Sequence, residues 1–493
     1  MKNRNLNQAL GEAARWSTVT EMAAKILTPV TTMILARLLM PEAFGVVATV
    51  TMIVSFADML ANAGFQNYLV QREFRDEKHK SDSTNVAFWT NLGISFCLWA
   101  VIAILREPIA YLVGNPGLGF VLTVACVQLP LTAFASIQTS LYRRSFDYKT
   151  LFIIRLISVS IPFVVTIPLA LLGWGYWSLI IGTICGALAN AVILTIRSPW
   201  KPSLFYDWQI FKEMFGFSAW SLLEAISIWL TGWIDILVIG SALSIYFLGL
   251  YRTSLTMVSG IMGIITAATT PLLFAALSRL QDDDKAFNKM FFTMQRIVAY
   301  FVLPLGAGIY LYSDVATQLF LGSQWTEAGS IVGIWAATSA IMIVLGHYSS
   351  EVYRAKGLPR LSFWAQVLHL VFLIPTCVIS LQYGFWALVY ARALIRLQLV
   401  VVHLFIMRYA VGFPVKTMFT NIFKPVVFTL VMYTIGLLLN HISPGFGWRT
   451  MAAGICMVIY AGLLLTFAEG DVRTITDVFV KRRIAEKTAD IQA

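Results

Sequence analysis

The sequence predicts an all-α polytopic membrane protein of about fourteen transmembrane helices, from its composition, its apolar runs and an internal repeat. Of its 493 residues, 58% are apolar and only 12% are charged, whereas soluble domains carry about a quarter charged residues. Apolar runs of about 20 residues recur, each long enough to cross roughly 30 Å of hydrocarbon as a helix. A membrane β-barrel would instead show alternating segments of about ten residues.

Part of the chain occurs twice. Trp16 to Gly45 and Trp220 to Gly249 share a spacing of 29 residues, and in each copy Trp-Ser begins an apolar run that ends in a short turn. Further paired motifs are Tyr142-Arg143 with Tyr353-Arg354, and Gly175-Tyr-Trp-Ser-Leu with Gly384-Phe-Trp-Ala-Leu. Each copy contains six spans, an even number, so both copies should have the same orientation and be related by an axis along the membrane normal.

The fourteen expected spans fall into three groups. Residues 1–204 form an N-terminal six-helix lobe, and 205–410 form a C-terminal six-helix lobe. Residues 411–471 add two further helices, and 472–493 form a basic cytoplasmic tail. In order, the expected spans are 16–36, 44–62, 85–105, 118–138, 151–172, 176–196, 215–239, 250–275, 294–313, 329–349, 363–381, 384–407, 422–440 and 449–468. The repeat predicts two parallel six-helix bundles, with the last two helices outside them.

Positive charge is concentrated on one side of the expected membrane. Of the 36 Lys and Arg residues, 27 fall in the two tails or in the gaps that follow even-numbered spans. Only Arg37, Arg106 and Arg449 fall in the odd-numbered gaps. The positive-inside rule therefore places both termini in the cytoplasm.

Several expected spans carry a narrow polar face, because residues 4, 7 or 11 positions apart lie on the same side of a helix. The aligned groups are Glu21, Lys25, Thr28 and Thr32; Thr51, Ser55, Asp58 and Asn62; Glu224, Thr231 and Asp235; and Arg252, Thr256, Ser259, Gly263 and Thr270. Ser and Thr alone would favour hydrogen bonds between helices. Ionised residues inside a membrane nearly always face water or a partner, so we expect a central cavity between the bundles.

The twelfth span carries the strongest charge signal. Arg392, Arg396 and His403 lie on one face of it, and Arg396 is near its middle. Two arginines at that depth cost on the order of 5–7 kcal/mol even on the milder insertion scale. The alternatives to a functional role are snorkelling toward the membrane surface and pairing with an acid such as Asp235.

Several function classes find no support in the sequence. The net charge of +11 is explained by the basic loops that set topology, so we expect no nucleic-acid partner. The five cysteines show no paired spacing, and the chain lacks a P-loop, an HExxH motif and a long outside loop that could form a catalytic domain. We therefore expect no metal, no cofactor and no enzymatic activity. An internal repeat with ionisable groups in its spans is typical of a transporter.

The order of several short motifs resembles the polysaccharide exporters of the multidrug/oligosaccharidyl-lipid/polysaccharide flippase superfamily. The resemblance covers nearly the whole chain. The matching stretches include Leu35-Ala-Arg-Leu-Leu-Met-Pro-Glu-Ala-Phe-Gly45, Leu141-Tyr-Arg-Arg-Ser-Phe146, Asp235-Ile-Leu-Val-Ile-Gly240 and Leu321-Gly-Ser-Gln-Trp325. The resemblance implies two six-helix lobes around a central cavity. It also implies that an undecaprenyl-pyrophosphate-linked oligosaccharide moves to the outer leaflet of a bacterial cytoplasmic membrane, by alternating access of the lobes.

Cations in the cavity of such a protein would bind the pyrophosphate, since Arg pairs with phosphate oxygens through two parallel hydrogen bonds. Four residues are candidates for this role: Lys25, Arg252, Arg392 and Arg396. The acids Glu21, Asp58, Glu224 and Asp235 are candidate cavity or coupling residues. Membrane lipids are expected contacts, and a polysaccharide polymerase and export proteins are candidate partners.

Two rival functions remain open on the sequence. A drug/cation antiporter of the same superfamily would normally have twelve spans and acids at the cavity centre; the four acids named above keep it a candidate. A polymerase or ligase of the polysaccharide pathway is the enzymatic alternative, and it usually has a long outside loop that this chain lacks.

Overall fold

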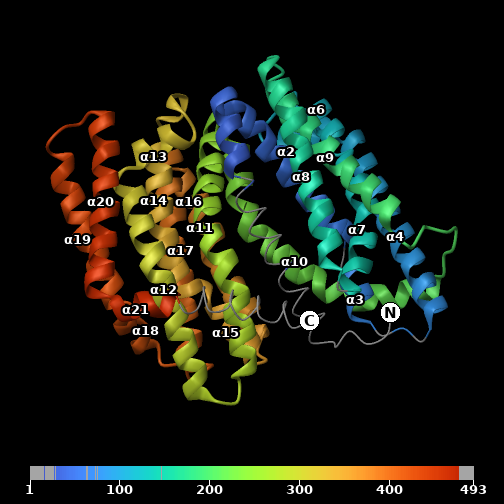
Figure 1. Cartoon of the computed structure of the whole chain (residues 1–493). Helices are drawn as coiled ribbons and strands as arrows, with labels where there is room; N and C mark the ends of the chain where they lie inside the picture. Colours follow the sequence, from blue (N-terminus) through green and yellow to red (C-terminus); the bar gives the residue numbers. More distant parts are fainter. Residues whose placement is uncertain are drawn as a thin grey trace. The chain divides into compact units, whose positions relative to one another are not determined.

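The computed structural model describes the chain as an assembly of helices. It describes residues 16, 27, 29–62, 65–72, 74, 76–145 and 147–476, with side chains except at 62, 67, 71, 215–224 and 474–476. Every regular element within these residues is helical, which confirms the predicted all-α class. The chain divides into two compact units: residues 1–267 with 366–392, and residues 268–365 with 393–493 (Figure 1).

The first unit contains the helices from α2 to α10, most of α11 and parts of α16 and α17. Their bounds are α2 Pro41–Asn62, α3 Phe65–Gln71, α4 Glu77–Ile104, α5 Arg106–Leu112, α6 Gly119–Ala125, α7 Gln128–Arg144, α8 Tyr148–Leu171, α9 Tyr176–Arg197, α10 Trp208–Ala242, α11 Ile245–Arg279, α16 Arg360–Leu381 and α17 Phe385–Tyr409. Helix α2 packs against α4, α7, α9 and α10, and α9 lies between α7 and α8 (Figure 1). The candidate residues of this unit are therefore carried on long, mutually packed helices.

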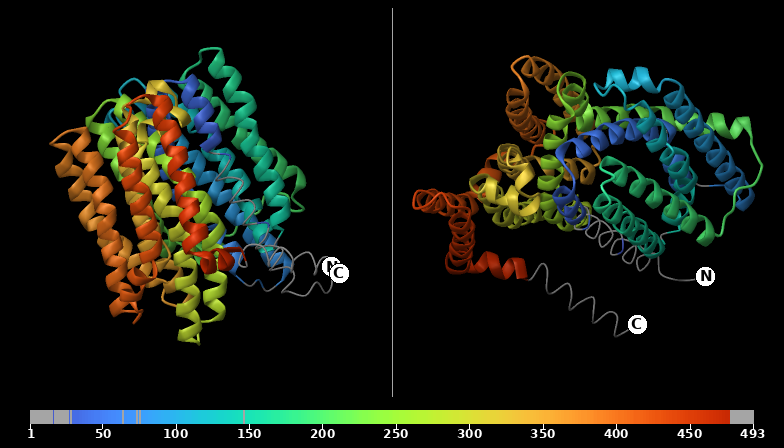
Figure 2. Two further views of the ribbon diagram at one scale, coloured as in Figure 1. Left: turned by 60° about the vertical axis from the view of Figure 1, so that its left-hand side comes forward. Right: turned by 90° about the horizontal axis from the view of Figure 1, so that it is seen from above.

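The second unit contains the ends of α11 and α17, the start of α16, and the remaining helices. Their bounds are α12 Asp284–Leu311, α13 Ser313–Phe320, a 3-10 turn Ser323–Trp325, α14 Ala328–Met342, a π-helical turn Ile343–His347, α15 Ser349–Ala355, α18 Val415–Asn421, α19 Phe423–Asn440, α20 Phe446–Phe467 and α21 Glu469–Thr476. Helix α12 packs against α14 and α19, and α19 stands beside α20 (Figure 2). The hydroxyl of Tyr460 donates to the carbonyl oxygen of Tyr300 at 2.8 Å, which ties α20 to α12.

Thirteen helical stretches of the described residues are long and apolar enough to cross a membrane. They correspond to the second through the fourteenth expected spans, so a multi-pass membrane protein is confirmed. Most of the first expected span, 16–36, lies outside the described residues; its end appears as an apolar helix at Pro29–Leu38. The division at 204, 410 and 471 stays a prediction, because compactness does not test an internal repeat.

Four helices begin at an aspartate on the basic side of the expected membrane. Asp76, Asp147, Asp207 and Asp283 precede α4, α8, α10 and α12, and each side chain accepts hydrogen bonds from backbone N–H groups of the first turn. Such caps satisfy donors that would otherwise have no partner. They explain why α10 begins at Trp208, about two turns before the apolar run expected from residue 215.

Two glycines from equivalent positions of the sequence repeat meet in the first unit. A Cβ atom added to Gly249 of α11 would overlap the carbonyl oxygen of Pro41 and lie 3.1 Å from the backbone nitrogen of Gly45 in α2. A Cβ added to Gly45 would overlap the carbonyl oxygen of Ile245. Only glycine permits backbones to approach this closely. The sequence feature that ends each repeated run therefore marks a close helix crossing.

Candidate functional site

Asp235 is the centre of a buried polar cluster in the first unit. It lies in α10, and only 2% of the residue is exposed. The hydroxyl of Tyr251, from α11, donates to its Oδ2 at 2.8 Å. Its Oδ1 accepts the backbone N–H of Ile236 at 2.8 Å. A carboxylate inside an apolar span is thus supplied with donors on both oxygens, as a buried charge requires.

Arg392 of α17 supplies the opposite charge. Its Nε donates to Oδ2 of Asp235 at 3.0 Å, and a terminal nitrogen donates to the carbonyl oxygen of Thr231 at 3.2 Å. Both charged side chains are more than nine-tenths buried. Gln366 of α16 also donates to the hydroxyl of Thr231. Four helices of the first unit, α10, α11, α16 and α17, are joined through this one cluster.

Arg252 follows Tyr251 in α11, but its guanidinium contacts an aromatic ring. Its guanidinium carbon lies 4.3 Å from the centre of the Trp233 ring. Within the described part of the chain, no carboxylate lies at ion-pair distance from it. A cation over an indole ring gains electrostatic attraction from the ring face. The N–H groups of a stacked guanidinium point outward in its plane, where they can donate to an anion.

Arg396 has a similar setting in the second unit. Its guanidinium carbon lies 4.1 Å from the centre of the Trp335 ring, and it donates to the hydroxyl of Ser339 at 2.9 Å. Trp335 and Ser339 are four residues apart in α14, so they share one face of that helix. The residue is partly buried, which agrees with its expected position near the middle of a span.

A second polar group of this unit surrounds the π-helical turn Ile343–His347. His347 at its end is 3.1 Å from the hydroxyl of Thr270, and the hydroxyl of Tyr348 is 2.6 Å from that of Thr269. Such turns widen a helix by one residue and often occur at functional sites. Hydropathy and residue spacing do not reveal this π-helical turn, because one extra residue in a turn leaves the apolar pattern nearly unchanged.

The structure brings together some of the residues singled out from the sequence. Asp235 and Arg392 form an ion pair, which was one of the alternatives considered for the arginine. Asp58 of α2 accepts a hydrogen bond from Thr132 of α7 at 3.3 Å, apart from that pair. Glu21 and Lys25 lie outside the described residues, as does the side chain of Glu224. Pyrophosphate binding by the four cations and a cavity or coupling role for the four acids both stay predictions.

The side chains of these clusters that were not selected from the sequence include three aromatic ones: Tyr251, Trp233 and Trp335. An aromatic residue in an apolar span usually signals only packing, so no pattern marked them. Two of them lie close in sequence to a charge inside a span, which could have marked them: Trp233 is two residues before Asp235, and Tyr251 directly precedes Arg252. Among the described residues, no three His, Cys, Asp or Glu side chains are grouped to hold a metal ion.

The fold and its charged spans define a class, the multi-pass α-helical membrane proteins that carry ionisable residues within their spans. The chain is similar to a lipid II flippase, MurJ, in its inward closed conformation, with a TM-score of 0.72 and 15% identity over 94% of this chain and 99% of that one. It is also similar to an inward-facing multidrug resistance transporter of the MATE family, with a TM-score of 0.60 and 14% identity over 82% and 99% of the two chains. At such identities these likenesses establish the fold alone.

The chain belongs to the polysaccharide biosynthesis protein family whose model matches residues 34–330. It is 26% identical over 327 residues to the succinoglycan biosynthesis transport protein ExoT of Rhizobium meliloti, a match that covers 66% of this chain and 65% of that protein. The match thus spans slightly less than two thirds of that relative. It is 21% identical over 434 residues to the teichuronic acid biosynthesis protein TuaB of Bacillus subtilis, covering 87% and 88% of the two chains. It is also 21% identical over 384 residues to the lipopolysaccharide biosynthesis protein WzxC of Escherichia coli.

Proposed function

We propose that this protein is a flippase that moves an undecaprenyl-pyrophosphate-linked oligosaccharide across the cytoplasmic membrane, for the synthesis of exopolysaccharide, capsule or lipopolysaccharide. It acts by alternating access and carries out no covalent chemistry. Family membership supports the pathway, because the names of its relatives concern transport or biosynthesis of surface polysaccharides. The fold supports the mode of action, since it is that of membrane transporters.

The observation that carries the proposal is the placement of arginines inside apolar spans with tryptophan rings at their faces. Arg252 lies over Trp233 and Arg396 over Trp335, at 4.3 and 4.1 Å. An interior charge is costly in a membrane, so it points to function by default. Stacking stabilises each cation, and the hydrogen bond of Arg396 to Ser339 also orients its guanidinium. A pyrophosphate is the anion that such a fork-shaped donor group matches best.

The proposed role of Arg392 differs, because it is already paired. Because Asp235 already neutralises it, a phosphate must compete with a carboxylate for the same guanidinium. We assign the first contacts with pyrophosphate to Arg252 and Arg396, and the contact with Arg392 to a state in which Asp235 has released it. Lys25 remains a proposed contact of the pyrophosphate, and Glu21, Asp58 and Glu224 remain proposed cavity or coupling residues.

The direct test is loss of the protein in its native host. Deletion should abolish the surface polysaccharide, while lipid-linked repeat units accumulate with their sugars still on the cytoplasmic leaflet. The position of the sugars is measured with a membrane-impermeant lectin or glycosidase, applied to intact spheroplasts and to opened membranes. Complementation with the wild-type gene is the positive control. Normal polymer in the deletion strain would refute the proposal.

A drug/cation antiporter is the second candidate, and a specific observation favours it. Asp58 and Asp235 are carboxylates within spans, and the fold is shared with a multidrug transporter. Carboxylates can bind cations or protons on behalf of a cationic substrate. If deletion leaves the polymer intact but raises sensitivity to cationic drugs, this second function is the correct one.

We also propose how the protein is oriented in the membrane and which partners it has. The protein lies in a bacterial inner membrane with both termini in the cytoplasm, as the distribution of Lys and Arg favours. It contacts membrane lipids throughout its spans. A polymerase that receives flipped repeat units, and the export proteins that follow, are the partners that this function requires.

A further inference from the structure

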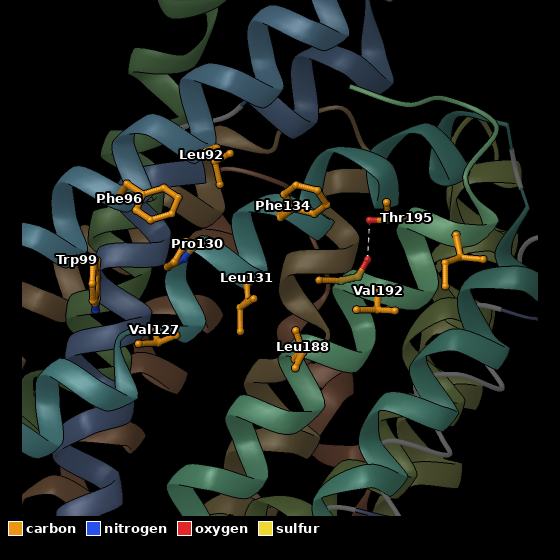
Figure 3. Close-up of a pocket in the computed structure, with 12 residues that line it drawn as sticks. Leu92, Phe96, Trp99, Val127, Pro130, Leu131, Phe134, Leu188, Val192 and Thr195 are labelled. Atoms are coloured by element: carbon orange, nitrogen blue, oxygen red, sulfur yellow. Dashed lines mark hydrogen bonds between the residues drawn. The ribbon is translucent and has the colours of Figure 1, made fainter. Parts of the chain in front are cut away.

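An apolar groove runs along the first unit between α4, α7 and α9. Its volume is about 680 Å³. Figure 3 shows Leu92, Phe96 and Trp99 on α4, Val127 directly before α7, Pro130, Leu131 and Phe134 on α7, and Leu188, Val192 and Thr195 on α9. About half of the surface of Phe96, Leu188 and Val192 is exposed, so the groove is open along its side. The hydroxyl of Thr195 donates to the carbonyl oxygen of Ala191 (Figure 3), and the indole N–H of Trp99 donates to that of Thr123, so both polar side-chain groups of the lining already have partners.

A second, polar pocket of about 520 Å³ lies at the basic end of the same three helices. It is lined by the first turns of α4, the last turn of α7 and the residues just after α9. Lys80 and Arg144 bring positive charge to it, and Glu77 contributes one carboxylate at the rim. By the distribution of Lys and Arg, this end lies at the cytoplasmic leaflet.

Two donors in the lining of this pocket have no acceptor within the described part of the chain. The Oγ of Ser198 and the Nε1 of Trp200 are buried, and neither has a hydrogen-bond partner there. Ser198 is only 3% exposed. A buried donor without an acceptor costs about 1–3 kcal/mol, so native proteins rarely keep one unless a ligand or water fills the position. Both residues line the same pocket as Lys80, so two donors and a cation are available there to an anion.

The groove and the pocket are neighbours along each helix. At the end of α9, Ile196 lines the groove, and Ser198, the residue directly after the helix, lines the pocket. On α4, Thr84 of the pocket and Leu92 of the groove are about 12 Å apart along the axis. An apolar groove that ends in a cationic pocket lined by hydrogen-bond donors matches a molecule with a hydrocarbon tail and an anionic head group.

We infer that this composite site binds one anionic glycerophospholipid of the cytoplasmic leaflet, with an acyl chain in the groove and the phosphate in the pocket. The charges favour a single phosphodiester: Lys80 and Arg144 against Glu77 leave one net positive charge. Arg144 already donates to the carbonyl oxygens of Leu69 and Arg72, at 2.9 and 2.6 Å, and so acts mainly through its field. Lys80 is the direct ligand, because among the described side chains its ammonium is held by Glu77 alone, at 3.0 Å.

The bound lipid stabilises the packing of the first unit. Side chains of α4, α7 and α9 line the groove, and its open side leaves them without protein contacts there. A hydrocarbon chain restores those contacts. Its phosphate would bridge the start of α4 and the residue after α9. The lipid is therefore a component of the folded unit, and it is distinct from the substrate proposed above.

The test measures lipid retention by the purified full-length protein with native mass spectrometry. Dioleoyl phosphatidylglycerol and dioleoyl phosphatidylethanolamine, which share acyl chains, are added in equal amounts. We expect one phosphatidylglycerol to be retained in preference to phosphatidylethanolamine. Lys80→Gln and Trp200→Phe should each weaken its binding by about fivefold or more, since each removes one donor to the phosphate. Glu77→Gln should strengthen it, because Glu77 competes with the phosphate for Lys80.

Filling the groove tests the position of the tail. Leu188→Trp should prevent retention of the lipid, whereas Val164→Trp, on the exposed face of α8, should not. Lys285→Gln, at an exposed lysine of the second unit, is the control for loss of charge. A thermal shift on adding phosphatidylglycerol should follow the same order, which separates lost binding from misfolding.

Three results would overturn the inference. Equal retention of the two phospholipids would remove the role of the head group. Unchanged retention in both Leu188→Trp and Trp200→Phe would place the lipid elsewhere. Tighter binding of undecaprenyl phosphate than of phosphatidylglycerol, with the same dependence on Lys80, would assign the site to the transported lipid instead. None of these measurements depends on export, so the proposed flippase function is tested separately.

Discussion

Neutralising the ion pair between Asp235 and Arg392 should reveal whether it holds the first unit together. Asp235→Asn leaves the guanidinium of Arg392 without its charge partner inside an apolar span, and Arg392→Gln leaves the carboxylate of Asp235 in the same position. The double variant removes both charges and keeps a hydrogen-bonding amide side chain at each position. The three variants form a double-mutant cycle.

The structure sets the expected magnitudes. Both side chains are more than nine-tenths buried, and the closest contact is 3.0 Å. Breaking a buried pair by removing one partner costs about 3–5 kcal/mol, because the remaining charge is uncompensated. The double variant leaves neither charge, so it should recover most of that loss. Tyr251→Phe removes one hydrogen bond to the carboxylate and should cost about 1.5–3 kcal/mol.

The assay is the fraction of monodisperse protein after heating in detergent, measured by size-exclusion chromatography, together with polysaccharide export in cells. The matched control is the pair of Arg449 with Asp314 in the second unit, at 2.6 Å but with both side chains partly exposed. Its rupture by Asp314→Asn should cost about 1 kcal/mol or less. We expect the Asp235→Asn/Arg392→Gln double variant to be stable but inactive in export.

Three outcomes would contradict this reasoning. If each single variant is as stable as the wild type, the pair does not stabilise the fold. If the stability losses simply add in the double variant, the two side chains do not interact energetically. Restored export in the double variant would show that Arg392 has only a structural role, and its proposed contact with pyrophosphate would be wrong.

Three further predictions concern other parts of the chain. Arg396→Ala should abolish export while the protein still elutes as a folded species. Arg396→Lys should retain part of the export, since lysine keeps the charge but loses the two parallel N–H donors of the guanidinium. Normal export by Arg396→Ala would show that Arg396 does not bind the substrate. Gly249→Val should destabilise the protein by about 1–3 kcal/mol or more through overlap with α2, whereas Gly454→Val, which has open space, should not. In intact cells, Ser323→Cys should react with an impermeant thiol reagent and Asp283→Cys should not until the membrane is opened; the reverse would refute the predicted orientation.

Much of the architecture could be predicted from the sequence, because the bilayer imposes a local rule. A span requires about 20 apolar residues whatever surrounds it, so thirteen of the fourteen expected spans could be compared with the structure and were found. The asymmetry of Lys and Arg is likewise local, and the orientation that follows from it stays a prediction. The repeat also marked Gly45 and Gly249, whose contact gives a physical reason for glycine at both positions.

The partners of the charged residues were decided only by tertiary structure. Asp235 and Arg392 are 157 positions apart, and nothing in either span specifies that the two side chains meet. The same holds for the tryptophan beneath Arg396, which comes from another helix. Hydropathy records only whether a residue suits lipid, whereas a contact depends on how helices rotate and cross. The sequence by itself therefore determined which residues lie in the membrane and which of them are charged; the packing of the helices decided that Arg392 would be neutralised by a carboxylate and Arg396 stacked on an indole ring.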